Sequence, residues 1–244
     1  MDKQQKLPIE AKYTQKWHLY NLAKTNEKRL FYQLLFDLCK IIPEPRYEFG
    51  RPPISPRDLI FSLGLKLYNG FSSRKIISDL KHAEGAGYLK KSPHFNTLTD
   101  FLNCQIVYDL LCRLLTISAM PLKQLEDKFS LDSSGFGSYQ YERWQRVKWK
   151  NKRGWQNYLK GYIMIGTKTN CICSCSITPG NFSDIRQAPR LLLKAKDNFN
   201  IKEVSADKAY SSQRLFQIIN GMNAKPYIPF KANANPSEES PEIW

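Results

Sequence analysis

Two aspartates in this chain stand where short apolar, strand-like runs of sequence end. Asp132 follows Phe129-Ser130-Leu131, and Asp207 follows Val204-Ser205-Ala206. Carboxylate oxygens are ligands that Mg²⁺ prefers, and this ion usually takes one or two protein carboxylates together with waters and phosphate oxygens. A pair of such ions can activate the attacking oxygen and stabilise the leaving oxygen of a phosphate ester. The two aspartates therefore predict metal-dependent cleavage of a phosphate backbone. The alternative is that Asp132 caps a turn and Asp207 begins a loop.

The charge of the chain points to a nucleic-acid partner. The 244 residues carry a formal net charge of +15, and residues 131–170 alone hold eight basic and two acidic side chains, with tryptophans and tyrosines between them. Lysine and arginine neutralise phosphates, and aromatic rings stack on exposed bases. A solvated basic loop explains the charge equally well. The basic residues that we expect to contact DNA are Arg143, Arg146, Lys148, Lys150, Lys152, Arg153, Lys160 and Lys208.

Other chemistries find little support in the sequence. Six cysteines include no CxxC pair, and only three histidines are present, which argues against a closed zinc site. Cys171, Cys173 and Cys175 alternate with other residues, so in a strand their thiols are predicted to share one buried face. Gly135 and Gly137 fit no nucleotide-binding spacing.

The sequence predicts a cytoplasmic protein with no membrane association. No window approaches the roughly 20 uninterrupted apolar residues that a membrane-spanning helix needs. The N-terminus is polar and basic and has no apolar stretch typical of a secretory signal.

The first half of the chain is predicted to be helical. Residues 1–54 comprise a loosely held polar arm up to residue 27, a helix from Lys28 to Lys40 and a proline-rich linker. Residues 55–127 form a second region, in which Ser55 and Pro56 begin a first helix and Ser72 or Ser73 a short second one. A longer third helix is expected from Thr97, with a buried face of Leu98, Phe101, Leu102, Tyr108, Leu111 and Leu115. These helices could form a helix-turn-helix for DNA or a small helical domain with another use.

Residues 128–244 are predicted to form an α/β domain. The pattern gives the element order β-β-β-α-β-α-β, with an antiparallel opening and then parallel strands joined by helical crossovers. Right-handed crossovers can place the strands that end at Asp132 and Asp207 side by side. The expected strands cover 129–132, 158–165, 171–178, 204–207 and 225–230, with a hairpin turn at 167–170 and helices at 184–198 and from Ser211 or Ser212.

Several stretches of the sequence resemble the DDE transposases of bacterial and archaeal insertion sequences. The resemblance covers roughly residues 55–230, because the helices from Ser55 to Leu80 and the residues 93–97 also look like the N-terminal region of this group. The stretches that carry it are Leu131-Asp132-Ser133-Ser134-Gly135-Phe136, Lys160-Gly161-Tyr162, Thr178-Pro179-Gly180-Asn181-Phe182-Ser183-Asp184 and Ala206-Asp207-Lys208-Ala209-Tyr210-Ser211-Ser212. Their order and spacing agree with the family pattern.

This resemblance implies an RNase H-like catalytic domain at 128–244 that uses Mg²⁺ or Mn²⁺ to cut and join DNA. The partners would be element ends and target DNA, within a synaptic complex of several copies of the chain. By position, Asp132 would be the first catalytic aspartate and metal ligand and Asp207 the second. Apart from the resemblance, Lys208 and Tyr210 beside Asp207 could contact phosphate, although exposed residues after a strand usually have no such role.

The family's third ligand, a glutamate, lies on a helix beyond the strand that here ends at Phe230. We find no such helix, so the domain is expected to be truncated before this glutamate and its catalysis impaired. Glu238, Glu239 and Glu242 lie in a segment rich in asparagine and proline, and they are poor substitutes because a metal ligand needs a rigid element.

Three functions remain open from the sequence. The first is a transposase that binds element ends and carries out metal-dependent strand cleavage and transfer. The second is a non-catalytic DNA-binding remnant of such an enzyme. The third is a general RNase H-like nuclease with no part in transposition.

Overall fold

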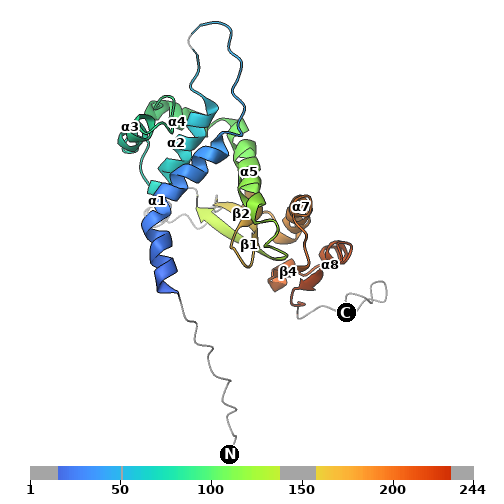
Figure 1. Cartoon of the computed structure of the whole chain (residues 1–244). Coiled ribbons are helices and arrows are strands. Elements are labelled where there is room, and N and C mark those ends of the chain that lie inside the picture. The colour runs from blue at the N-terminus through green and yellow to red at the C-terminus, as the bar shows by residue number, and fades with distance from the viewer. Residues whose placement is uncertain (1–15, 51, 138–157, 232–244) are drawn as a thin grey trace, which may run out of the picture. The chain divides into compact units, whose positions relative to one another are not determined.

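The chain divides into two compact units, Met1–Cys104 and Gln105–Trp244. The computed structural model describes residues 16–50, 52–137 and 158–231 (Figure 1). The described part of the first unit is helical, and the second unit is built around one β-sheet. The predicted fold class, an α/β domain preceded by an all-α region, is therefore confirmed.

The first unit contains α1 (Trp17–Cys39), α2 (Pro56–Asn69), α3 (Ile77–Gly85) and α4 (Phe95–Leu102). The predicted start of α2 is confirmed, because the Ser55 side chain accepts a hydrogen bond from the backbone N–H of Arg57 and Pro56 is the first helical residue. The helix ends at Gly70, which has a left-handed φ of 65°. Leu59, Phe61, Leu63 and Leu65 are buried along it.

Two helix boundaries differ from the prediction. α1 begins at Trp17, so residues 17–27 are helical and not part of a loose arm. The sequence did not predict this part of the helix because it has no buried apolar face: Cys39 is the only described residue of α1 that is buried. The expected single helix from Thr97 is interrupted at Asn103, and α5 (Gln105–Ala119) follows as a separate helix. The break changes which side chains are covered: Leu98, Val107 and Leu114 are buried, whereas Leu102, Tyr108 and Leu111 are exposed.

Five strands of the second unit form one sheet in the order β3-β2-β1-β4-β5. β1 pairs antiparallel with β2, and β2 with β3, whereas β1–β4 and β4–β5 are parallel. The turn between β2 and β3 contains Asn170 in a left-handed conformation with φ 57°. The predicted antiparallel opening, the parallel pairing that follows it and the adjacency of the strands that end near Asp132 and Asp207 are thus confirmed. The strands are β1 (Lys128–Gly137), β2 (Tyr158–Gly166), β3 (Ile172–Pro179), β4 (Glu203–Ala206) and β5 (Lys225–Tyr227).

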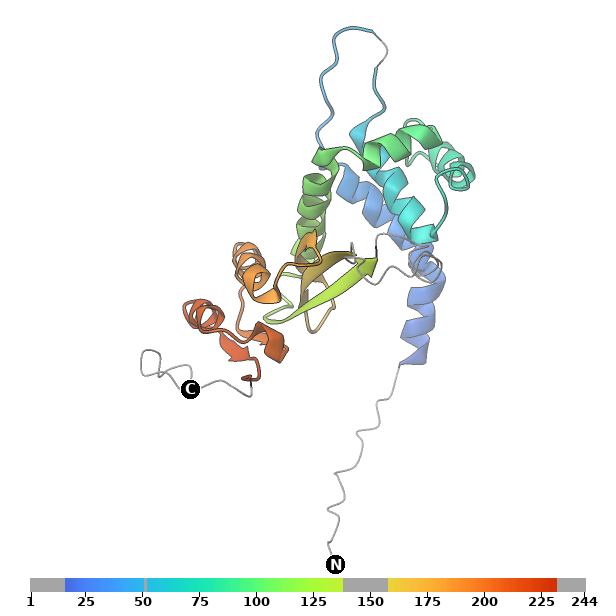
Figure 2. The same ribbon diagram turned by 180° about the vertical axis from the view of Figure 1, so that it is seen from behind.

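The helices α7 (Asp184–Lys196) and α8 (Gln213–Asn220) share one hydrophobic core with the sheet. Both views show these two helices close together beside the strands (Figure 1) (Figure 2). Alternate residues of the strands contribute to this core, so one face of the sheet is defined as the α7 face. Its members from the sheet and the two helices are Phe129, Leu131, Tyr162, Met164, Val204, Ala188, Leu191, Leu192, Ala195, Leu215, Phe216 and Ile219.

The strands depart from the prediction in length and in one register. β1 continues through Gly137, because residues beyond Asp132 still pair with β2, and β5 ends at Tyr227. The register between β2 and β3 shifts at Met164 and Ile165. As a result the alternating cysteines do not share a face: Cys173 lies in the core, while the Cys175 sulfur lies 3.7 Å from that of Cys112 on α5.

Within the described residues, one segment, Gln105–Leu122, is long and apolar enough by composition to cross a membrane. It comprises α5 and the short helix η1 (Met120–Leu122). α5 packs against β3 in the second unit, where the Tyr108 hydroxyl accepts a hydrogen bond from the Ile177 backbone N–H at 3.3 Å. Helices of soluble proteins meet the same criterion, so the segment is weak evidence for a membrane span.

The core position of α7 can be tested with two leucines that are close in sequence. Leu191 is fully buried and Leu193 is 52% exposed. Leu191→Ala is expected to lower the free energy of unfolding by about 2–5 kcal/mol, because it removes buried methyl groups and leaves a cavity. Leu193→Ala is the control and should change it by no more than about 0.5 kcal/mol. Urea denaturation of both variants checks this; equal losses would contradict the packing.

Candidate metal and nucleic-acid site

The register between β1 and β4 brings the two aspartates together. Leu131 pairs with Ala206 at the end of this parallel ladder, so Asp132 and Asp207 are the next residues on adjacent strands. Neighbouring strands are about 4.8 Å apart. Leu131 and Ala206 pack into the core on the α7 face, and successive side chains alternate, so both carboxylates project from the opposite face. Both aspartates are exposed to solvent.

A backbone N–H orients each carboxylate. Asp132 Oδ1 accepts from the N–H of Ser133 at 2.7 Å, and Asp207 Oδ1 accepts from the N–H of Ala209 at 2.8 Å. The second bond caps the short helix η2 (Lys208–Tyr210). Neither aspartate forms an ion pair with a described cation. One oxygen of each carboxylate is therefore held in place while the other can bind a ligand.

This donor set fits magnesium or manganese. Two carboxylates, completed by waters and phosphate oxygens, are an ordinary environment for Mg²⁺. No group of three or more histidine, cysteine, aspartate or glutamate side chains that could hold a metal occurs within the described segments. Glu238, Glu239 and Glu242 lie outside the described residues. Asp132 and Asp207 are thus the candidate ligands that the structure describes.

The basic residues predicted to contact DNA fall into three groups. Lys208 is exposed and follows Asp207 directly. Lys160 instead forms an ion pair with Asp184, with only 21% and 18% of their side chains exposed. This pairing raises the pKa of Lys160, mainly because Asp184 is its hydrogen-bonding partner. The remaining six lie outside the described residues: Arg143, Arg146, Lys148, Lys150, Lys152 and Arg153.

Three alternate residues of β2 hold the segment between β3 and α7. The Tyr158 hydroxyl donates to the Gly180 carbonyl at 2.7 Å, and the Tyr162 hydroxyl donates to the Phe182 carbonyl at 2.9 Å. Lys160 lies between these tyrosines on the same face and binds Asp184 in the first turn of α7. These contacts connect two stretches that the sequence analysis singled out separately, 160–162 and 178–184.

Gly180 is required by this arrangement. A Cβ at this position would lie 2.3 Å from the Tyr158 ring. That is far below normal contact distance, so any larger residue at position 180 would displace the Tyr158 ring. It would also break the hydrogen bond that the Tyr158 hydroxyl donates to the carbonyl at position 180. The glycine permits close approach of β2 to the loop that begins α7.

Tyr210 is a part of the site that the sequence did not identify correctly. Its side chain is 2% exposed, so it is buried and does not face phosphate. Burial raises the pKa of its hydroxyl, the neighbouring Ser133 side chain lowers it, and the charges of Asp184, Asp132 and Asp207 raise it further. Tyr210 and Asp184 lie in stretches that resemble the family, which was the available signal, but the effect of the Asp184 charge on Tyr210 depends on tertiary packing.

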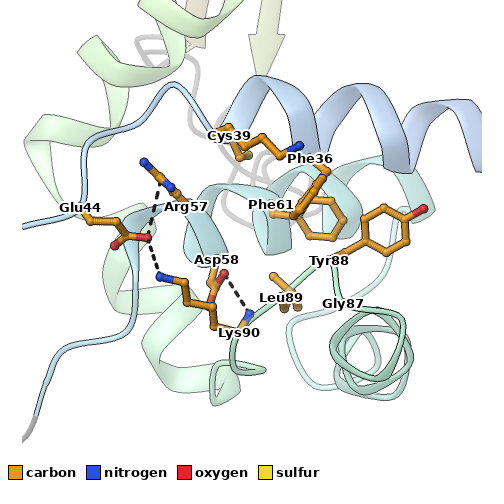
Figure 3. Close-up of a pocket in the computed structure, with 11 residues that line it drawn as sticks. Phe36, Cys39, Glu44, Arg57, Asp58, Phe61, Gly87, Tyr88, Leu89 and Lys90 are labelled. Atoms are coloured by element: carbon orange, nitrogen blue, oxygen red, sulfur yellow. Dashed lines mark hydrogen bonds and ion pairs between the residues drawn. The ribbon is translucent and has the colours of Figure 1, made fainter.

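A cavity of about 300 Å³ lies in the first unit, away from these aspartates in sequence (Figure 3). Phe36, Phe61 and Tyr88 are among its walls. Its charged groups are paired within the unit, since Glu44 Oε1 lies 3.6 Å from Arg57 Nε and 3.5 Å from Lys90 Nζ.

The buried Asp58 of this cavity serves the fold. Its carboxylate accepts from the backbone N–H groups of Lys90 and Lys91, at 3.4 and 3.2 Å. Burial raises the pKa of Asp58, and these two hydrogen bonds lower it. Because its charged groups already have partners, we assign the cavity to support of the helical unit and not to ligand binding.

Comparison with known proteins shows what the part of the chain that contains the sheet is similar to. Residues 123–240 match the family described as "Transposase DDE domain". No protein with a curated description matches the chain. A solved structure that the chain matches is the "Cryo-EM structure of piggyBac transposase synaptic complex with hairpin DNA (SNHP)", with 12% identity and a TM-score of 0.40. The match covers 88% of this chain and 52% of that one, so this chain spans about half the length of that transposase.

The matched residues contain the mixed sheet and the two adjacent aspartates, so this part of the chain is similar to transposase DDE domains.

The cap that Asp207 provides can be separated from its charge. Asparagine caps helices about as well as aspartate, whereas alanine in place of a cap costs about 1 kcal/mol. Asp207→Asn is therefore expected to keep wild-type stability, and Asp207→Ala to lower it by about that amount. Thermal and urea unfolding check this. Equal stability of the two variants would show that the hydrogen bond to Ala209 contributes nothing.

Proposed function

We propose that this chain is the transposase of a DNA insertion sequence, and that Asp132 and Asp207 bind the Mg²⁺ or Mn²⁺ used for strand cleavage and transfer. The observation that carries the proposal is the β1–β4 register, which makes the two residues neighbours on the open face of the sheet. The transposase family of residues 123–240 supplies the reaction class.

The chain's own residues prepare this chemistry. Bound divalent metal would supply Lewis-acid stabilisation of charge on the oxygens of the scissile phosphate. Asp132 and Asp207 hold the metal, and the N–H groups of Ser133 and Ala209 fix the direction of each carboxylate. Lys208, exposed beside Asp207, is placed to neutralise a phosphate of the bound strand.

DNA is the proposed macromolecular partner, both as element ends and as target. The net charge of +15 favours association with a polyanion. The basic residues between 143 and 153 and the helices of the first unit are the further candidate contacts. We place the protein in the cytoplasm and propose that several copies act together on paired ends.

The two-carboxylate site also supports a second candidate, a DNA-binding relative without catalysis. The described residues offer no third carboxylate beside Asp132 and Asp207. Such a protein would occupy element ends without nicking them. The distinction depends on cleavage, not on binding.

The metal site is tested first by binding and then by cleavage. The full chain is expected to bind Mn²⁺ in isothermal titration, and Asp132→Asn and Asp207→Asn should each weaken this at least about tenfold, because each removes one of two charged ligands. Cleavage of DNA carrying the native element ends should require Mg²⁺ or Mn²⁺ and disappear in either variant.

The outcomes separate the candidates. Metal-independent cleavage, or cleavage unchanged in Asp132→Asn, would overturn the assignment of the site. Specific binding of the ends with no nicking in either metal would favour the non-catalytic relative. Equal cleavage of arbitrary DNA would instead indicate a general nuclease.

The role of Lys208 is tested by the salt dependence of DNA binding. Each phosphate contact that is lost reduces the slope of log K against log salt concentration by about one unit. Lys208→Ala is expected to show this reduction in fluorescence anisotropy titrations. Lys202→Ala is a matched control, since Lys202 is exposed but pairs with Asp127 at 3.2 Å. An equal change in both variants would argue against a specific contact by Lys208.

A further inference from the structure

Two buried oxygens behind the candidate metal site have unused hydrogen-bonding capacity. Tyr210 Oη and Asp184 Oδ1 are fully buried and have no hydrogen bond of normal geometry within the described residues. Nearly all buried polar groups in folded proteins have such a partner, either in the protein or through an ordered water. A phenol donates and a carboxylate accepts, so the two groups are chemically complementary.

The packing of α7 against η2 brings the elements of these two groups together, and their electrostatics agree with it. Asp184 has the largest effect on the pKa of Tyr210 among the three carboxylates that raise it. Helix α7, which begins at Asp184, also packs against η2, which ends at Tyr210. Lys160 contacts the same Asp184 oxygen and neutralises its charge. A carboxylate oxygen can accept more than one hydrogen bond, so this ion pair leaves room for a second donor.

Tyr210 is linked to both aspartates through short stretches of backbone. It closes η2, whose first turn Asp207 caps, so its position restrains the backbone at Asp207. On the other side its hydroxyl neighbours the side chain of Ser133, whose N–H orients the Asp132 carboxylate. A single buried residue is therefore linked to the supports of both candidate ligands.

We infer that Tyr210 is a positioning residue: its hydroxyl donates to Asp184 through one buried water, while Lys160 neutralises Asp184. This unit of three side chains lies on the α7 face and fixes the backbone of Asp207 beside Asp132 on the opposite face. The expected effect on metal binding rests on the proposed function. The link between Tyr210 and Asp184 does not, and it can be tested separately.

The test uses variants that change one group at a time. Tyr210→Phe removes only the hydroxyl, and Asp184→Asn removes only the charge. Each is expected to raise the Kd of the full chain for Mn²⁺ by about three- to tenfold, below the usual effect of losing a direct partner of a ligand. The double variant should bind Mn²⁺ no more weakly than the weaker-binding single variant, because the effects of substitutions within one interacting unit are not additive. Tyr227→Phe is the control, since this tyrosine is 54% exposed on β5, and it should leave the Kd unchanged.

A change in melting temperature without a change in Mn²⁺ affinity would show a merely structural role and overturn the inference. Additive losses in the double variant would overturn the common unit. Wild-type affinity for Mn²⁺ in Asp184→Glu, together with weakened affinity in Asp184→Asn, would support the need for a negative charge at this position.

A second readout is independent of metal binding. In ¹³C-tyrosine-labelled protein, the Tyr210 hydroxyl proton is expected to exchange slowly with water in the wild type and quickly in Asp184→Ala, which removes the acceptor, with Tyr227 fast in both. Equal exchange of the Tyr210 proton in the two proteins overturns the link. If exchange behaves as expected but Asp132→Asn leaves Mn²⁺ affinity unchanged, the proposed metal site fails while the Tyr210–Asp184 link stands.

Discussion

The parallel pairing of β1 with β4 is the constraint on which the rest of the second unit depends. The ladder runs from Lys128 opposite Glu203 to Leu131 opposite Ala206. Side chains alternate along a strand, so a shift by one residue would turn the core residues outward and the aspartates inward. Phe129, Leu131 and Val204 prevent this shift, since their burial against α7 and α8 depends on the observed register. The same contacts that stabilise the core therefore decide where the carboxylates lie.

The sequence anticipated this arrangement because its signals are local. Alternating apolar residues identify β2, β3 and the start of β1, and the helical spacing of Ala188, Leu191, Leu192 and Ala195 identifies α7. Together with the usual handedness of crossovers, these elements predict that the strands bearing Asp132 and Asp207 are neighbours. The second half of β1 escaped prediction because its serines and glycines do not alternate with apolar residues. The start of α1 escaped for a related reason, since polar residues cover most of that helix.

The tertiary partners of the site were beyond local patterns. Lys160 carries the same charge whether it meets DNA or a carboxylate, and only the packing of α7 on β2 shows that Asp184 is its neighbour. Tyr210 follows an exposed aspartate in sequence, yet its ring is buried. The structure thus divides the work between two faces of the sheet. Buried polar contacts on the α7 face support the backbone, and the opposite face leaves the carboxylates accessible.

The outer half of the β1–β2 ladder extends beyond the last residues that pair with β4 and ends at Gly137 opposite Tyr158. Positions 138–157 therefore leave and re-enter the sheet at one pair of neighbouring residues. In evolutionary terms this is a permissive point of insertion, because lengthening a segment between two fixed, adjacent ends adds only about 0.6 kcal/mol of closure entropy per doubling for a flexible chain. Related proteins could gain or lose residues here while the register of the strands and the spacing of the aspartates stay the same.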